Sequence, residues 1–259
     1  MQEGYWMIRT WQAGNVGEKT KYFLPGARPT GKVRRRDVRA AKKQEQNGYA
    51  AQKALARLLN ANFGSGDCLL GLDYSEAGME KILSRGREAG LAVDDEDEAV
   101  RMNAIWEAAD HEISNCLRRA KRKAKKLGVE LKAVYCTSDM DGQNGEQVRV
   151  HHHLVINREA RAAFELAWKD MGGVDWETLW ENQEDLTPVA EYLIRQVRRI
   201  PDAKKYHSTR NLIRPEPKDR IAMNDAEMRP PKGARLVYRS EFRPGLPQYI
   251  RYIIGHDRR

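Results

Sequence analysis

The sequence has few cysteines and no long apolar run, and each absence excludes a class of protein. Its 259 residues include only three cysteines, Cys68, Cys116 and Cys136, which lie far apart and form no C-x-x-C pair. Neither a disulfide framework nor a thiolate zinc site is expected, and the thiols are expected in the core. No apolar run approaches the roughly 20 residues that a membrane-spanning helix needs. The sequence therefore predicts no membrane partner.

The first residues also lack the features of a secretion signal. The opening MQEGYWMIRTW has no ordered succession of basic, apolar and small residues, so we expect a cytoplasmic protein. A hydrophobic content of 41% over this length is enough for one sizeable globular domain with appendages.

Positive charge is in excess, and it is concentrated near the beginning of the chain. The formal net charge is +9 with a pI near 9.4, which favours a polyanionic partner because bound phosphates release their counterions. The segment between Lys19 and Arg57 contains the run Arg34-Arg35-Arg36 and few acids, and a helix-like AAQKALARLLNANF ends it. Residues 1–60 are predicted to form a basic arm and a helix. The alternative for the arm is a solvated, partly disordered tail.

The middle of the chain alternates between predicted strands and helices. The apolar run 68–74, CLLGLDY, is flanked by turn residues and predicts a buried strand. The acidic DDEDE opens a long helix with one apolar face, basic residues at its end and Gly128 as its stop. The strands LKAVYCTS and VRVHHHLVI flank DMDGQNGEQ and indicate a hairpin. A helix over 160–171, a strand over 174–180 and a helix from Thr187 follow.

This order of elements predicts an α+β fold. It matches a ferredoxin-like split βαβ with a central antiparallel sheet and helices on one face. We assign this domain to residues 61–212. The remaining residues, 213–259, are predicted to form a C-terminal extension with a small β-hairpin, ARLVYRSEF…PQYIRYIIG.

Three consecutive histidines interrupt the predicted strand VRVHHHLVI. Alternation places His151 and His153 on one face and His152 on the other. Two imidazoles side by side on a rigid strand are a ready pair of metal ligands. The alternative, two satisfied core histidines, would require two separate sets of hydrogen-bond partners.

The last predicted helix, TPVAEYLIRQVRR, separates apolar from polar residues. Thr187 is the expected cap and Pro188 occupies the favoured first position. The apolar side contains Val189, Ala190, Leu193, Ile194 and Val197, and the opposite side contains Tyr192, Arg195, Gln196 and Arg199. A tyrosine used for packing should lie with the leucine, and Tyr192 does not.

Taken together, these motifs resemble those of a known family. His151-x-His153 in an apolar strand, followed by Tyr192 on a later helix, resembles the HUH endonucleases. The set LLNANFGSGDCLLGLDYS, RVHHHLVIN, EYLIRQ and YHSTRNL is similar to rolling-circle replication initiators of bacterial plasmids and phages. The sequence departs from them in three places: the central His152 is polar, the helix has Tyr-x-x-Arg, and LGLDY replaces a threonine-rich strand.

The resemblance implies a metal-dependent nickase acting on single-stranded or hairpin origin DNA. Mg²⁺ or Mn²⁺ would be held by His151 and His153, and Tyr192 would attack the scissile phosphate. The products would be a 5′-phosphotyrosine and a free 3′ hydroxyl that primes replication, with later rejoining of strands. Arg195 would favour the phenolate. The sequence has no helicase motif, so a host helicase and polymerase are the expected partners.

Several assignments stay open at this point. Gln196, one helical turn after Tyr192, is the preferred third metal ligand because single-tyrosine transposases use a glutamine in that relation; Asp73 is the alternative. Arg199 and Arg210 are predicted to bind DNA, and Tyr206 is the next candidate nucleophile. A single-tyrosine HUH transposase and a non-enzymatic DNA-binding regulator are the alternative functions.

Overall fold

The structure, a computed structural model, describes residues 4–26, 47–141, 146–180, 183–197 and 204–255. Within these ranges it is an α+β protein with two antiparallel sheets of five strands each. The predicted α+β class with an antiparallel sheet is confirmed. The helices are α1 (Asn47–Asn62), α2 (Glu76–Glu88), α3 (Glu98–Lys126), α4 (Arg161–Trp168) and α5 (Thr187–Arg195). None of the helices described is long and apolar enough to cross a membrane.

One sheet, sheet B, is built from the middle of the chain and carries the histidines. Its strands are β3 (Cys68–Leu72), β4 (Ala133–Met140), β5 (Gln147–Ile156), β6 (Val174–Thr178) and β7 (His207–Ser208). They lie in the order β6-β3-β5-β4-β7, and every neighbouring pair is antiparallel. The central strand is β5, which pairs His153 with Gly71 of β3 on one side and with Cys136 of β4 on the other. The histidines are therefore at the middle of the sheet.

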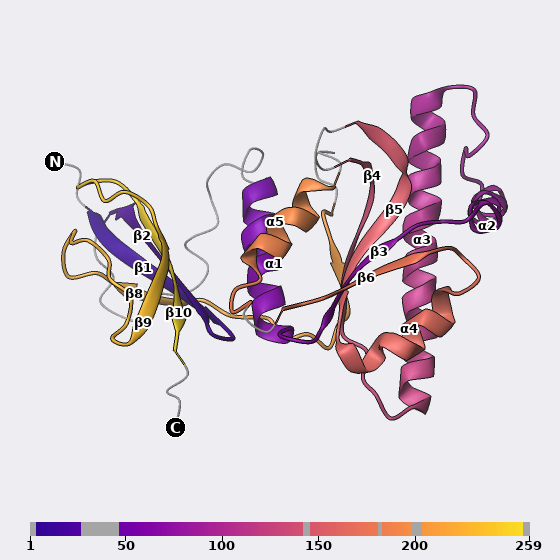
Figure 1. Cartoon of the computed structure of the whole chain (residues 1–259). Helices are drawn as coiled ribbons and strands as arrows, with labels where there is room; N and C mark the ends of the chain where they lie inside the picture. Colours follow the sequence, from indigo (N-terminus) through magenta and orange to yellow (C-terminus); the bar gives the residue numbers. More distant parts are fainter. Residues whose placement is uncertain (1–3, 27–46, 142–145, 181–182, 198–203, 256–259) are drawn as a thin grey trace.

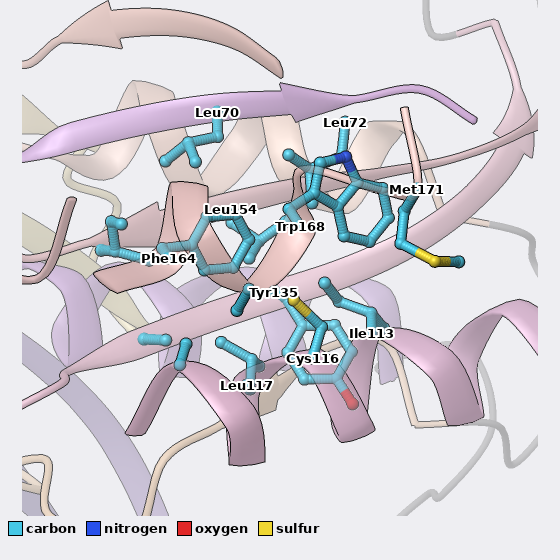
Figure 2. Close-up of a cluster of buried hydrophobic side chains, with 14 of the residues drawn as sticks. Leu70, Leu72, Ile113, Cys116, Leu117, Tyr135, Leu154, Phe164, Trp168 and Met171 are labelled. Carbon is cyan, nitrogen blue, oxygen red and sulfur yellow. The ribbon is translucent and has the colours of Figure 1, made fainter. Parts of the chain in front are cut away.

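Both faces of sheet B are covered by helices (Figure 1). Apolar residues of α3 and α4 pack on one face, where Leu70, Leu72 and Leu154 of the strands point toward Phe164 and Trp168 of α4 (Figure 2). On the other face, α1 and α5 pack against Val134, Cys136 and Val155. The expectation of helices on one face was wrong, because α1 and α5 cover the second face. Residues 47–62 were predicted to form a helix next to the basic arm and outside the domain, and they form α1.

The long helix α3 has the ends that its sequence predicts. Asp97 caps it by accepting hydrogen bonds from the backbone N–H of Ala99 and Val100, at 2.8 and 3.2 Å. Gly128 follows its last turn with φ of 73°, in the left-handed region that favours glycine. The basic residues of its last turn complement the helix dipole.

The second sheet, sheet A, joins the two ends of the described chain. Its strands are β1 (Gly4–Ala13), β2 (Val16–Pro25), β8 (Lys218–Ile221), β9 (Ala234–Arg239) and β10 (Gln248–Ile254), in the order β8-β1-β2-β10-β9. The predicted C-terminal hairpin is present as β9 and β10, but β10 also pairs with β2. Thus residues 4–25 are not part of a basic arm, whose main run at 27–46 lies outside the described residues.

Helix α1 lies between the two sheets and contacts each of them with a different side. Leu55 and Leu59 are buried on the sheet B side. On the other side, Arg57 forms a salt bridge with Glu18 of β2 at 2.7 Å and stacks over Trp11 at 3.6 Å. Gly14, in the turn between β1 and β2, has φ of 55° and lies so close to the Asn60 carbonyl that a Cβ would be 2.3 Å from it. Sheet A therefore packs on α1 through polar contacts.

Candidate functional site

His151 and His153 lie side by side on the face of sheet B that α5 covers. Their Nε2 atoms are 3.1 Å apart, and their rings are perpendicular with centroids 4.9 Å apart. His153 is buried, whereas His151 is partly exposed. The predicted pairing of these two side chains on one face is thus what the strand geometry produces.

The hydrogen-bond partners of the pair make Nε2 of His151 an acceptor that faces Nε2 of His153. Nδ1 of His151 lies 2.9 Å from the carbonyl oxygen of Arg149, which can only accept, so this nitrogen carries the proton. Nδ1 of His153 faces the Tyr192 hydroxyl at 3.4 Å. Burial, followed by the charge of His151, lowers the pKa of His153 to about 4, so the ring is neutral at pH 7.

This arrangement fits a divalent cation. At 3.1 Å the two Nε2 atoms are within hydrogen-bond distance, and a divalent cation bound between them would replace the proton that they share. Nitrogen ligands at about 2.1 Å and at right angles around one ion would themselves be separated by about 3 Å. The backbone carbonyl on His151 is the kind of outer partner that orients a metal-binding imidazole. Among the described residues, no group of three or more His, Cys, Asp or Glu side chains converges on one point, so other ligands would complete the shell.

The helix that carries Tyr192, α5, is held at its start by Asp185. Its N-cap residue is Leu186, whose side chain makes no capping hydrogen bond. Instead, the Asp185 carboxylate accepts hydrogen bonds from the backbone N–H and the hydroxyl of Thr187. The prediction that Thr187 caps the helix was therefore wrong by one residue: the N-cap position is Leu186, and Asp185 supplies the acceptor. Pro188 is in the first turn, as expected.

The two sides of α5 divide as the periodicity predicts. Val189, Ala190 and Leu193 are buried against sheet B, whereas Tyr192 is 41% exposed. The ring of Tyr192 lies edge-on to that of His153, with centroids 5.2 Å apart. Its pKa is raised, chiefly by burial and next by the negative charge of Glu177, while a hydrogen bond from Gln196 lowers it. The phenol is thus held beside the histidine pair in its neutral form.

Gln196 contacts the nucleophile candidate rather than standing apart from it. It is the C-cap residue of α5, it is buried, and its side chain is hydrogen-bonded to Tyr192. Its backbone carbonyl accepts a hydrogen bond from the Ser138 hydroxyl of β4. Because Ser138 pairs with His151 across the sheet, this contact fixes the end of α5 to the strand beside the histidines.

The predicted arginines differ in their distance from the histidine pair. Arg195 is exposed at the end of α5, three residues after Tyr192. Arg210 is exposed and follows β7, where Thr209 bonds to Ala133, at the opposite end of β4 from the His151 level. Five residues of strand separate these levels, about 17 Å. Arg199 lies outside the described residues.

Asp73 and Tyr206 lie next to strands that flank the histidine strand. Asp73 is exposed just beyond β3, one residue after Leu72, which pairs with His152, and its backbone N–H donates to the Gly173 carbonyl. Tyr206 is partly buried against the cluster beneath α1 and α5 and directly precedes β7. It comes one residue before His207, which pairs with Tyr135 of β4.

Two acidic residues of the site were missed in the sequence. Asp175 and Glu177 alternate with Trp176, which packs on the α3 and α4 face, so the two acids project toward the histidine face. Asp175 pairs with Gly71, the neighbour of His153, and both acids act electrostatically on Tyr192. Since Gly71 has no side chain, the surface between Asp175 and His153 is open. The alternation in VDWET was the available signal.

His152 belongs to a separate network on the opposite face. The Thr137 hydroxyl donates to Asp110 at 2.7 Å and accepts from Nδ1 of His152 at 3.0 Å. Nε2 of His152 then accepts from the Tyr74 hydroxyl at 2.6 Å. Burial is the main cause that lowers the pKa of His152 well below 6.5. This histidine is a satisfied core residue.

Comparison with known proteins found no matching family model, no matching curated protein and no matching solved structure.

Proposed function

We propose that this protein is an HUH-type endonuclease that nicks single-stranded DNA through Tyr192 with a divalent metal ion. The observation that carries the proposal is the chain of contacts from His151 to His153 to Tyr192, at 3.1 and 3.4 Å. A phenol within reach of an imidazole pair whose Nε2 atoms face each other is the pairing of nucleophile and metal site that tyrosine-dependent phosphodiester cleavage needs.

The fold also supports this assignment. In sheet B, β3 and β4 are connected through α2 and α3 and leave one strand position between them, which β5 fills. Likewise, β5 and β6 are connected through α4, and β3 lies between them. We propose on this basis that sheet B follows the split βαβ, ferredoxin-like plan, with α1, α5 and β7 added to it.

Each residue of the candidate site has its own role in the proposed cleavage reaction. Mg²⁺ or Mn²⁺, when bound at His151 and His153, would polarise the scissile phosphate and balance its negative charge. With Nε2 committed to the ion, His153 keeps its proton on Nδ1 and donates it in a hydrogen bond toward the Tyr192 oxygen, which favours the phenolate. Gln196 acts in the same direction.

In the cleavage step, the Tyr192 oxygen forms a bond to phosphorus and the bond from phosphorus to the 3′ oxygen breaks. The tyrosine proton leaves to solvent, and the released 3′ oxygen takes up a proton. The protein then carries the 5′ phosphate, and reversal of the step rejoins the strand. A free 3′ hydroxyl can prime synthesis, which is why we propose initiation of rolling-circle replication, with a host helicase and polymerase, as the biological role. A single-tyrosine transposase would use the same chemistry.

Asp175 enters as a further candidate for the metal shell. It lies across Gly71 from His153 on the same face of the sheet, and a carboxylate oxygen is a ligand that Mg²⁺ and Mn²⁺ prefer. Gln196, hydrogen-bonded to Tyr192, and Asp73, exposed at the strand end, are the other candidates.

The test is covalent capture. A labelled pool of single-stranded and hairpin oligonucleotides is incubated with the protein and Mn²⁺, and denaturing electrophoresis is used to look for a protein–DNA adduct. We expect an adduct that requires Mn²⁺ and that peptide mapping places on Tyr192. An adduct on another residue, or none with any oligonucleotide while Mn²⁺ binding is intact, would overturn the proposal.

A further inference from the structure

A cleft of about 790 Å³ opens along the edge strand β6, beside the candidate site. Its walls include Ser65 and Gly66 before β3, the residues 177–180 at and after the end of β6, Arg158 in the turn before α4, and Arg161 at the start of α4. It is an open depression with polar and apolar walls, and Glu177 belongs both to this cleft and to the surroundings of Tyr192. The cleft is therefore continuous with the electrostatic environment of the nucleophile.

Trp180 gives the cleft a free aromatic surface. Its side chain is 73% exposed, whereas Trp168 is fully buried and Trp176 packs against the core. The backbone that carries it is held firmly: Leu179 donates to the Asp67 carbonyl at 2.8 Å, and Gly66 donates to the Leu179 carbonyl at 3.0 Å. An indole held at a fixed place and left open to solvent can stack on a planar ligand.

Two arginines line the side of the cleft next to α4. Arg158 is anchored through its backbone N–H, which donates to the Asp67 carboxylate at 2.9 Å, and its guanidinium lies against Gly66. Arg161 lies over the Trp176 ring at 4.4 Å and bonds to Glu165 at 3.0 Å. The guanidinium groups of both arginines therefore present N–H donors at the cleft, and such donors suit phosphate oxygens.

Glu177 sets the direction in which a ligand would lie. A carboxylate repels phosphate but accepts hydrogen bonds from the amino groups of bases. A nucleic-acid strand in the cleft would therefore turn its bases toward Glu177 and Trp180 and its phosphates toward Arg158 and Arg161. A duplex hides its base faces, so the ligand must be unpaired.

We propose that this cleft binds the bases of the unpaired DNA strand next to the scissile phosphate, with one base stacked on Trp180 and the backbone held by Arg158 and Arg161. This inference rests on the proposed nickase function, since it takes single-stranded DNA as the substrate. It adds a binding subsite some distance along the sheet edge from the reacting atoms, so it contributes affinity and not chemistry.

The test measures binding separately from cleavage. With EDTA present, fluorescence anisotropy gives the Kd of a labelled single-stranded oligonucleotide for the wild type and for Trp180→Ala, Trp180→Phe and Leu166→Ala. Leu166 is an exposed apolar residue of α4 and serves as the matched control. We expect Trp180→Ala to raise the Kd about 5- to 100-fold, Trp180→Phe to stay within about threefold because its ring still stacks, and the control to match the wild type.

The arginines are tested by salt dependence. Removing both in Arg158→Ala/Arg161→Ala should lower the slope of log Kd against log salt by about 1.4, at about 0.7 per phosphate contact on a single strand. The exposed pair Arg118→Ala/Arg122→Ala on α3, neither of which lines the cleft, should leave the slope unchanged.

The outcomes separate this inference from the proposed nuclease. An unchanged Kd in Trp180→Ala, in a protein that still forms the Tyr192 adduct, would overturn the cleft and leave the nuclease standing. If Trp180→Ala weakens DNA binding but the wild-type protein forms no adduct, the cleft is supported and the nuclease is overturned. At saturating DNA, the cleavage rate of Trp180→Ala should stay within about twofold of the wild type, because the cleft acts in binding alone.

Discussion

The hydroxyl oxygen of Tyr192 lies 3.4 Å from Nδ1 of His153, and the other nitrogen of the same ring faces His151 at 3.1 Å. One imidazole therefore touches both the candidate nucleophile and the candidate metal position. Since α5 is held at its end by the contact between Ser138 and the Gln196 carbonyl, this relationship depends on the packing of α5 on sheet B. The predictions below separate the contributions of these residues.

Tyr192→Phe should abolish the covalent DNA adduct and leave stability and DNA binding unchanged. The hydroxyl is on the exposed side of α5, and the ring itself is kept, so packing against His153 survives. Denaturing electrophoresis detects the adduct, and urea unfolding measures stability. Tyr206→Phe is the control, because Tyr206 is partly buried against the cluster beneath α1 and α5 and should keep full cleavage. Persistent nicking by Tyr192→Phe would transfer the role to another residue.

His151→Ala and His153→Ala should each weaken Mn²⁺ binding at least tenfold. Each change removes one of two nitrogen ligands that face a common point. Isothermal titration calorimetry with MnCl₂ measures the affinity without any DNA. His111→Ala, on the exposed surface of α3, is the matched control and should bind Mn²⁺ as the wild type does. Equal affinities in all four proteins would exclude a metal site at the pair.

Gln196→Ala and Asp175→Asn should distinguish two versions of the metal shell. If Gln196 is the third ligand, its removal raises the Mn²⁺ concentration for half-maximal nicking about 10- to 100-fold, and excess Mn²⁺ restores the rate. If Asp175 is the ligand, Asp175→Asn produces that shift. Gln196→Ala then lowers only the maximal rate, because a hydrogen bond to Tyr192 is lost.

Asp73→Asn tests the remaining candidate ligand, since Asp73 follows Leu72, which pairs with His152. If Gln196 or Asp175 is the ligand, the metal titration of nicking for this variant overlays the wild-type curve. A shift in Asp73→Asn alone would return the third ligand to the strand end and contradict both versions.

His152→Leu should destabilise the fold by about 1–3 kcal/mol, because it leaves the buried Tyr74 hydroxyl without its acceptor. The HUH endonucleases that this motif resembles usually have an apolar residue at this place, but here the histidine connects Tyr74 to Thr137. Adding Tyr74→Phe should recover much of the loss, since both partners are then apolar. Urea unfolding of the single and double variants measures this. A double variant no more stable than His152→Leu would contradict the network.

The same histidine makes the metal-free protein sensitive to acid. Burial lowers the pKa of His152 in the folded state, whereas in the unfolded chain it titrates near 6.5. Below pH 6.5 the unfolded chain binds the extra proton, so stability falls with falling pH, by up to about 1.4 kcal/mol per pH unit for this group. Above pH 6.5 the full stability is present. Unfolding in EDTA from pH 7.5 to 5 should therefore show a shallower slope for His152→Leu/Tyr74→Phe than for the wild type.

Local patterns predicted most of sheet B. Alternation and helical periodicity found β3, β5, α3 and α5 within a few residues, because each element buries one face and shows it in sequence. The same alternation placed His151 and His153 together, and periodicity placed Tyr192 away from Leu193.

Residues joined across long stretches of chain could not be predicted in this way. Sheet A pairs β2 with β10, and the sheet B network joins Tyr74 to His152; neither partner carries a local signal for the other. The helix α1 was predicted, but its place between the two sheets was not, because its contacts with sheet B and with Glu18 of β2 join residues far apart in the chain. Asp175 was missed because its importance comes from Gly71 and His153 in neighbouring strands.

The pairing of β2 with β10 has a consequence for synthesis on the ribosome. The hairpin of β1 and β2 emerges first, but the strand that completes its edge is made only after all of sheet B, roughly 10–45 s later at about 5–20 residues per second. During that interval the backbone groups of β2 are an open edge that can pair with another chain. A nascent chain that stalls before Gln248 should therefore be prone to aggregate, while its histidine sheet is already complete.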